Sequence, residues 1–161
     1  MSMSARIESH LLDREVVYEL IQHKPTGSTH ESASAAHVRD HQVAKAVMVH
    51  DGAAQAMAVI PGDARLDLDT LSVHGGRRFR LDDETDLARL FPDCAPGAVP
   101  PLGPLYGIET YLDEALTTPE PVYFEAGDHM FLVRVSGEDF QRLLPDARRG
   151  HYGHRESAPL W

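Results

Sequence analysis

The sequence predicts a single α+β domain, residues 1–145, followed by a C-terminal tail, residues 146–161. Its 161 residues match one domain at roughly 150 residues per domain. With 42% hydrophobic and 25% charged residues, its composition is that of an ordinary globular chain. Segments with helical spacing are mixed with short apolar runs, and several of these runs are adjacent in sequence. This order favours a mixed or antiparallel sheet over a regular βαβ array.

The N-terminal part of the chain is expected to form a helix, a strand and a second helix. Apolar residues at helical spacing predict the first helix over residues 5–14. β-Branched and aromatic residues predict a strand over 16–23. A capping-box pattern that begins at Ser28 predicts a second helix of about three turns.

The middle of the chain is expected to begin with a β-hairpin. The apolar runs 43–49 and 56–60 are separated by the turn pair Asp51-Gly52, which predicts two buried, paired strands. Leucines at helical spacing predict a short helix before Gly75-Gly76. Acidic residues at the start of 82–90 suit the positive end of a further helix.

The last third of the predicted domain contains three strands and one helix. The strands are expected over residues 108–112, 121–125 and 129–135. Ser136 is the expected cap of the last helix, which ends near Leu144. Residues beyond that helix show no period, so we interpret them as a tail.

Charge and cysteine content exclude several classes of function. The formal net charge of −10 argues against a nonspecific nucleic-acid coat, although a local basic patch stays compatible with it. The single cysteine, Cys94, excludes an internal disulfide and a multi-cysteine zinc site, and it is compatible with the reducing cytoplasm in which we expect the protein. No apolar run approaches the roughly 20 residues that span a bilayer. Neither a membrane nor DNA is therefore an expected partner.

Lys45 is the first candidate site residue because it is the only charge in the apolar run VAKAVMV. A lysine among apolar neighbours loses hydration unless an anionic or carbonyl-rich group meets it. Its ammonium suits a phosphate or a polarised carbonyl. The alternative is a strand-end lysine that extends to water.

A rigid loop is the second candidate. Four prolines and two glycines lie within residues 96–104. Proline fixes φ, and glycine permits close approach of a ligand, so this loop can aim backbone groups at a substrate. The alternative is a purely structural crossover between the helix over 82–90 and the next strand.

The sequence predicts no metal site and no covalent nucleophile. Among ten histidines, His37 and His41 lie four residues apart, but no carboxylate completes a zinc spacing, so a metal hydrolase is the weakest of three hypotheses. Nothing near Cys94 in sequence would lower its pKa, which argues against a catalytic thiol. His129, at a strand start, is the histidine with the best claim to a site.

Taken together, these features resemble the YbaK/ProX family, the prolyl-tRNA-synthetase-associated domains that deacylate mischarged tRNA. The resemblance covers about residues 5–144. Its motifs are the strand VVYELIQH, the segment THESASAA, the apolar strand with Lys45, the Gly-x-x-x-Pro match Gly97-Ala98-Val99-Pro100-Pro101 and the strand VYFEAG. It implies an α+β fold around a mixed, partly barrel-like sheet with flanking helices.

The resemblance also implies a reaction and its residues. The reaction is hydrolysis of the ester between an amino acid and the terminal ribose of tRNA, without metal or cofactor. Lys45 would bind the terminal phosphate or carbonyl region, and the Gly97 backbone would position the attacking water or the ribose hydroxyl. The implied substrate-binding residues are Tyr18, Thr26, Val99, Pro100, Pro101, Gly103, Glu125, Gly127 and His129.

The implied partner is the acceptor end of aminoacylated tRNA, with a synthetase or an elongation factor to assist capture. Two positions depart from the family: Ala46 stands where a hydroxyl is frequent, and Glu125 stands where a serine or another small polar residue is frequent. These departures and the acidic charge leave a second hypothesis open. In it the chain is a weakly active or inactive module that binds tRNA or aminoacyl groups and serves regulation.

Overall fold

A computed structural model describes residues 3–24, 32–33, 36–95 and 98–154 of the chain. The described α-helices are α1 (Ala5–Asp13), α3 (Leu68–Gly75), α4 (Glu84–Leu90) and α5 (Gly137–Leu143). The described strands are β1 (Glu19–Gln22), β2 (Ala44–His50), β3 (Gln55–Pro61), β4 (Arg65–Leu66), β5 (Arg80–Leu81), β6 (Glu109–Asp113), β7 (Val122–Glu125), β8 (Phe131–Val135), β9 (Arg148–Gly150) and β10 (Gly153–His154). Short 3₁₀ segments lie at Asp40–Gln42, Gly103–Tyr106 and Glu114–Leu116.

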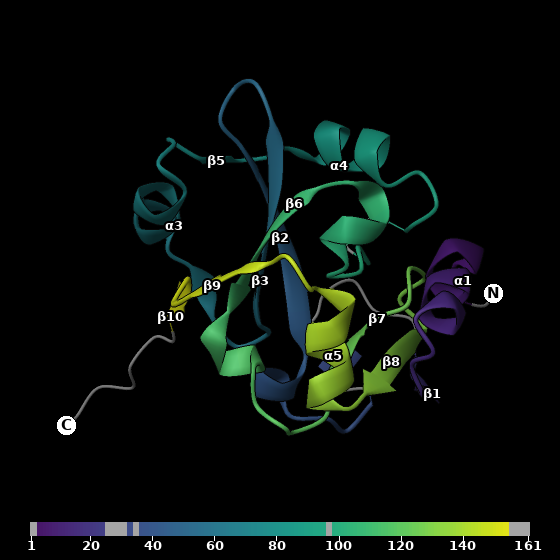
Figure 1. The fold of residues 1–161 in the computed structure, drawn as a ribbon. Helices are drawn as coiled ribbons and strands as arrows, with labels where there is room; N and C mark the ends of the chain where they lie inside the picture. Colours follow the sequence, from purple (N-terminus) through teal and green to yellow (C-terminus); the bar gives the residue numbers. More distant parts are fainter. Residues whose placement is uncertain (1–2, 25–31, 34–35, 96–97, 155–161) are drawn as a thin grey trace.

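A five-stranded mixed sheet with the order β5-β2-β3-β6-β9 forms the centre of the domain. The hairpin β2–β3 is antiparallel and runs through the middle of the molecule, as the sequence predicts (Figure 1). Strand β6 pairs in parallel with both β3 and β9. A second, antiparallel sheet has the order β1-β8-β7, and a parallel bridge between Val43 and Tyr123 joins the two sheets beside β2. These arrangements confirm the predicted α+β class and mixed sheet.

Helix starts follow the local signals in the sequence. The side chain of Asp83 accepts the Asp86 backbone N–H at the start of α4, and the reciprocal bond completes a capping box. Ser136 caps α5 by accepting the N–H of Asp139, which confirms the expected boundary. Helix α1 buries Ile7 and Leu11 against the core, whereas Leu12 is exposed.

The core has two parts, one on each face of the central sheet. The larger cluster fills the space between the sheets, α1 and α5, and it includes Met48, Phe124 and Phe140. The smaller one lies under α3 and includes Leu71 and Tyr152. The cavity described below opens beside the larger cluster, so its walls are held by the main core.

The residues after Leu144 contribute more to the fold than the sequence predicts, because part of the expected tail, residues 146–161, forms β9 and β10. Tyr152 is fully buried between these strands. The carboxylate of Asp113 accepts the backbone N–H groups of Tyr152, at 3.0 Å, and Gly153, at 2.7 Å. These two strands depend on pairing with β6 and β4 rather than on a periodic pattern of their own, so their sequence gives no sign of them.

Other sequence expectations differ in extent or cannot be compared. The strand expected over 16–23 is limited to Glu19–Gln22. Most of the helix expected after Ser28 lies outside the described residues. In the described part of the chain, no helix is both long and apolar enough to cross a membrane.

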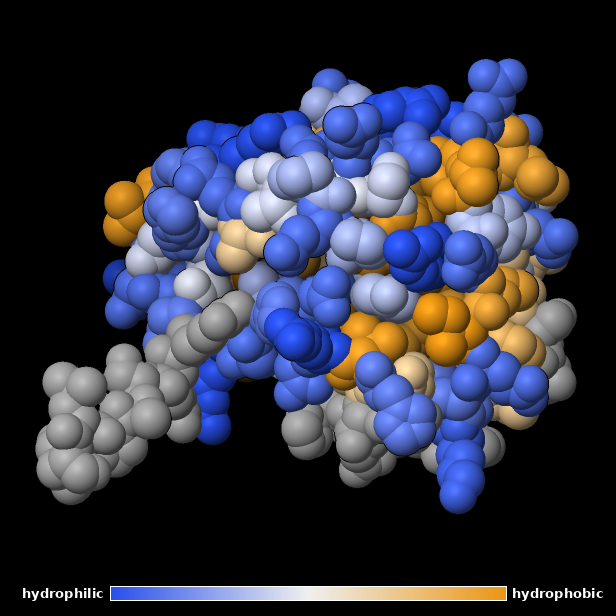
Figure 2. All heavy atoms as spheres, turned by 90° about the horizontal axis from the view of Figure 1, so that it is seen from below, coloured by the Kyte–Doolittle hydropathy of each residue, from blue (hydrophilic) through white to orange (hydrophobic). Residues whose placement is uncertain are grey.

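The surface is mainly hydrophilic, with apolar side chains gathered on one side of the face in Figure 2. That side is the one on which α1 and β1 lie in Figure 1. The exposed large apolar residues of the described chain are Leu12, Val17, Leu20, Val73 and Leu81.

Candidate functional site

A cavity of about 230 Å³ lies between β2, β5, α4, the proline-rich loop and the end of β7. Apolar residues of β2 form much of its wall, with Leu81, Leu87 and Val99. Its ionisable lining residues are Lys45, Asp82 and Glu125. The cavity is smaller than the roughly 300–1,000 Å³ of sites for drug-sized ligands, so it suits a compact chemical group.

Lys45 is half-buried in this wall instead of lying fully in water. Its Nζ donates to the carbonyl oxygen of Gly62, at 3.3 Å. Burial lowers the pKa of Lys45 below its usual value; Arg65 adds to this effect, and Asp63 opposes it. An ammonium has three N–H donors, and the bond to Gly62 uses one of them. The lysine can therefore donate further hydrogen bonds to a ligand in the cavity.

Glu125 ends β7 and is only 3% exposed. Neither of its carboxylate oxygens makes a well-formed hydrogen bond with a described residue, although the Ser32 hydroxyl lies near enough to interact with them. Burial raises its pKa, and the Ser32 hydroxyl, His129 and His23 oppose the shift. The ring Nδ1 of His129 lies 3.8 Å from Oε1 of Glu125.

The turn between β7 and β8 holds His129 next to Glu125. His129 is buried and has a φ of 58°, a strained value for a residue with a side chain. The carboxylate of Asp128 accepts the N–H groups of Met130 and Phe131, at 2.9 and 3.1 Å. This turn thus fixes the backbone that carries the histidine, and strain of this kind is typical of functional segments.

The proline-rich loop reaches the cavity through Val99. The backbone N–H of Ala95, just before the loop, donates to the carbonyl oxygen of Gly127 at 2.7 Å. Gly127 has a φ of 98°, which favours glycine. This hydrogen bond joins the loop to the turn that follows Glu125, so the two parts of the candidate site are held together. Gly97 and Thr26 lie outside the described residues.

Other residues that the resemblance implies do not line the cavity. Pro100, Pro101 and Gly103 are buried in the loop. A Cβ on Gly103 would lie 1.9 Å from Oγ1 of Thr110, so this glycine is required by packing against β6. Tyr18 packs against the larger core cluster. The structure therefore brings Lys45, Val99 and Glu125 together, with Gly127 and His129 adjacent.

Sequence reasoning missed Asp82 and its neighbour Leu81. Their acidic context indicated only a helix start, but β5 pairs with the end of β2 and turns both residues toward the cavity. Burial and the nearby Asp86 raise the pKa of Asp82. A pairing signal for β5 was absent because the strand has only two residues.

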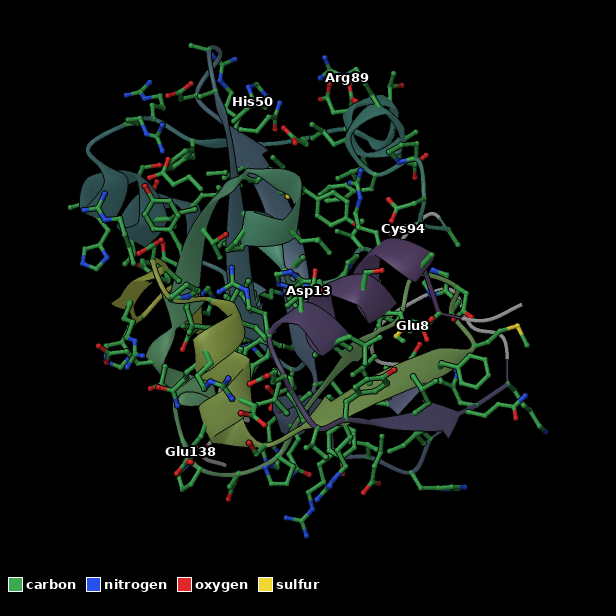
Figure 3. The ribbon with its side chains drawn as sticks, turned by 45° about the vertical axis from the view of Figure 1, so that its right-hand side comes forward. Glu8, Asp13, His50, Arg89, Cys94 and Glu138 are labelled. Atoms are coloured by element: carbon green, nitrogen blue, oxygen red, sulfur yellow. The ribbon has the colours of Figure 1, made fainter. Side chains whose placement is uncertain are left out.

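Cys94 lies beside α1 (Figure 3) and is poorly suited to nucleophilic chemistry. Burial raises the pKa of its thiol to about 11, so the thiolate is scarce near neutrality. Its Sγ lies 3.5 Å from the Tyr106 hydroxyl. The ranges that the structure describes contain no cluster of three or more potential metal ligands.

A groove of about 860 Å³ between α3 and residues 76–80 is lined by three arginines. Arg77 is held by ion pairs to Asp51 and Glu109. Arg78 and Arg80 are exposed, and their side chains form no hydrogen bond or ion pair with any described residue. Since Arg80 lines the groove and the next residue lines the cavity, the two recesses lie on either side of β5.

Comparisons with known proteins agree with this fold. The chain is similar to the hypothetical protein APE2540, with 24% identity, a TM-score of 0.81 and coverage of 92% of this chain and 99% of that one. It is also similar to a proposed trans-editing enzyme for prolyl-tRNA synthetase, with 24% identity, a TM-score of 0.79 and coverage of 96% and 99%. A proposed signal transduction protein from Marinobacter aquaeolei VT8 matches at 19% identity and a TM-score of 0.76, over 94% of this chain and 31% of that one.

Among curated proteins, no sequence matches this chain significantly. The family comparison is more informative, because the aminoacyl-tRNA editing domain matches residues 23–143. That range includes the cavity, the proline-rich loop and the β7–β8 turn. The chain therefore belongs to the aminoacyl-tRNA editing domain family.

Proposed function

We propose that this protein hydrolyses the ester bond of mischarged aminoacyl-tRNA in trans. The observation that carries the proposal is the small cavity in which Lys45 and Val99 of the proline-rich loop meet, in a chain of the editing family. A compact cavity suits an amino acid on the terminal ribose better than a larger ligand. A tRNA substrate also implies that the protein works in the cytoplasm.

In the proposed reaction, the oxygen of a water molecule attacks the ester carbonyl carbon. The bond from that carbon to the ribose oxygen breaks, and the ribose oxygen takes the proton that the attacking water gives up, so the products are the free amino acid and the ribose hydroxyl. The Lys45 ammonium stabilises the charge that develops on the carbonyl oxygen or holds the terminal phosphate. The Gly97 backbone positions the water, as the Gly-x-x-x-Pro resemblance implies, and a stiff loop lowers the entropy cost of this arrangement.

The arginine groove supports a tRNA substrate despite the acidic charge of the chain. The exposed side chains of Arg78 and Arg80, which pair with no described residue, can contact phosphates of the acceptor strand while the terminal ribose enters the cavity. The net charge of −10 disfavours binding of a polyanion such as tRNA. Two arginine–phosphate contacts therefore give only weak binding of tRNA. A synthetase or an elongation factor would then assist capture.

The test is a panel of tRNAs mischarged with alanine, serine or cysteine, incubated with the purified protein. We expect ester loss above the uncatalysed rate for at least one of them. The double variant Arg78→Ser/Arg80→Ser should lower kcat/KM and flatten its salt dependence, because fewer counterions are released. Absence of ester loss with every tRNA would refute the proposed hydrolysis.

A regulatory binding module is the second candidate, and Glu125 and Ala46 favour it. Both positions differ from the residues that are frequent in active family members. This candidate predicts saturable binding of tRNA or aminoacyl groups without turnover. Filter binding in parallel with the deacylation panel separates the two functions.

A further inference from the structure

A basic and an acidic side chain line the cavity without pairing with each other. Nζ of Lys45 donates to the Gly62 carbonyl, while the nearest ionisable neighbour of the Glu125 carboxylate is the His129 ring. No ion pair joins Lys45 to Glu125, although both residues are described and both line the same cavity. A ligand that carries a cation beside a polar oxygen can therefore meet both groups at once.

The chain brings these two residues to the same cavity through one contact between strands. Val43, just before β2, and Tyr123 of β7 form an isolated parallel bridge. Lys45 and Glu125 each lie two residues after the bridge, and residues two apart in a strand point to the same face. The arrangement is therefore built by the joint between the two sheets and does not depend on a loop.

The carboxylate of Glu125 is only partly satisfied by its neighbours. Its side chain is 4% exposed, and neither oxygen makes a well-formed hydrogen bond with a described residue. Its described neighbours are the Ser32 hydroxyl and the His129 ring, whose Nδ1 lies 3.8 Å away. An acid in this position is costly unless something donates to it. The other wall residues of β2 are apolar, which strengthens any charged contact made inside the cavity.

We propose that Glu125 binds a primary ammonium group and that Lys45 binds the neighbouring carbonyl or carboxyl oxygen of the same small ligand. This choice of ligand rests on the proposed function: the ligand is an aminoacyl ester with a free α-amino group. Esters that lack the ammonium, such as α-hydroxyacyl or N-acetylaminoacyl esters, are then poor substrates. A free small amino acid carries the same two groups, and the experiment distinguishes it from the ester.

The experiment compares hydrolysis of alanyl-tRNA and lactyl-tRNA, which differ only in an ammonium against a hydroxyl. Loss of a charge-assisted contact lowers binding or rate by about 10- to 150-fold. Wild-type protein should therefore hydrolyse alanyl-tRNA with a kcat/KM about 10-fold or more above that for lactyl-tRNA. N-Acetylalanyl-tRNA should also be hydrolysed slowly. In Glu125→Gln the preference should fall below about threefold. An unchanged preference in this variant, or no preference in the wild type, overturns the proposal.

Matched variants separate Glu125 from general effects of charge. Glu120→Gln removes an exposed carboxylate just before β7 and should retain the wild-type preference. Asp82→Asn removes the other acid of the cavity. If Asp82→Asn loses the preference for alanyl-tRNA and Glu125→Gln keeps it, the assignment to Glu125 is overturned. Glu125→Ser replaces Glu125→Gln if thermal unfolding shows that the glutamine variant does not fold.

A binding measurement keeps this inference separate from the proposed hydrolysis. Calorimetry with 3′-alanylamido-3′-deoxyadenosine and its lactyl counterpart requires no turnover. Ammonium-dependent binding that is lost in Glu125→Gln supports the inference, even if no ester is hydrolysed. Equal binding of the two compounds, or no binding of either, overturns it. If free alanine binds as tightly as the adenosine conjugate, the ammonium site stands but the aminoacyl ester is refuted as its ligand.

Discussion

Replacing Lys45 by methionine tests the candidate site directly. Methionine retains the apolar stem that packs along the cavity wall and removes the ammonium. Loss of a charge-assisted contact of about 1.5–3 kcal/mol in the transition state corresponds to about a 10- to 150-fold lower kcat/KM for ester hydrolysis. The assay follows loss of radiolabelled amino acid from the best tRNA of the mischarged panel, corrected for the uncatalysed rate.

The effect of Lys45→Met on stability should be small. The variant loses one hydrogen bond, to Gly62 at 3.3 Å, worth about 0.5–1.5 kcal/mol. It also removes a charge that burial disfavours, as the lowered pKa of Lys45 indicates. We therefore expect the free energy of unfolding to stay within about 1 kcal/mol of the wild type in urea titrations at neutral pH.

The pH dependence of stability supplies a second readout. The pKa of Lys45 is lower in the folded state than in the unfolded chain. Between these two pKa values, the unfolded chain therefore holds more protons than the folded protein, and stability rises with pH. The wild type should therefore gain stability relative to Lys45→Met as pH rises from neutral toward the ordinary pKa of lysine. A constant difference between the two proteins would contradict the burial of the ammonium.

Lys24→Met is the matched control, since Lys24 is the only other lysine in the chain and it is exposed. It removes the same charge from the acidic protein and should leave hydrolysis within about twofold of wild type. If Lys45→Met keeps activity within the same twofold, Lys45 does not contact the reacting ester. If both variants lose activity equally, the effect is one of net charge.

Three further predictions test burial and packing elsewhere in the fold. Gly103→Ala should lower the free energy of unfolding by about 1–3 kcal/mol in urea titrations, since its Cβ would lie 1.9 Å from the Thr110 Oγ1. Unchanged stability would refute the packing role of this glycine. Tyr152→Ala should cost about 3–5 kcal/mol by the same measurement because the ring is fully buried, whereas a residue in a free tail would cost almost nothing. Cys94 should react slowly with a thiol reagent at pH 8, since a pKa of about 11 leaves about 0.1% thiolate; labelling at the rate of free cysteine would contradict its burial.

The sequence by itself determined the local elements and one residue of the site. Caps at Asp83 and Ser136 and the turn pair in the β2–β3 hairpin act over a few residues, so their consequences can be predicted from neighbours in the chain. Lys45 was found in the same way, because a single charge in an apolar strand is a local anomaly. The resemblance to the editing family also depended on such short motifs and their order.

Only the tertiary structure decided which residues meet at the cavity. Lys45, Asp82, Val99 and Glu125 are distant in sequence, and they converge because β5 pairs with the end of β2 and a single bridge joins β2 to β7. It also decided that Gly103 serves packing and that β9 and β10 complete the sheets. Pairing between distant strands depends on side chains and backbone groups that no local pattern contains, so it becomes visible only when the chain is folded.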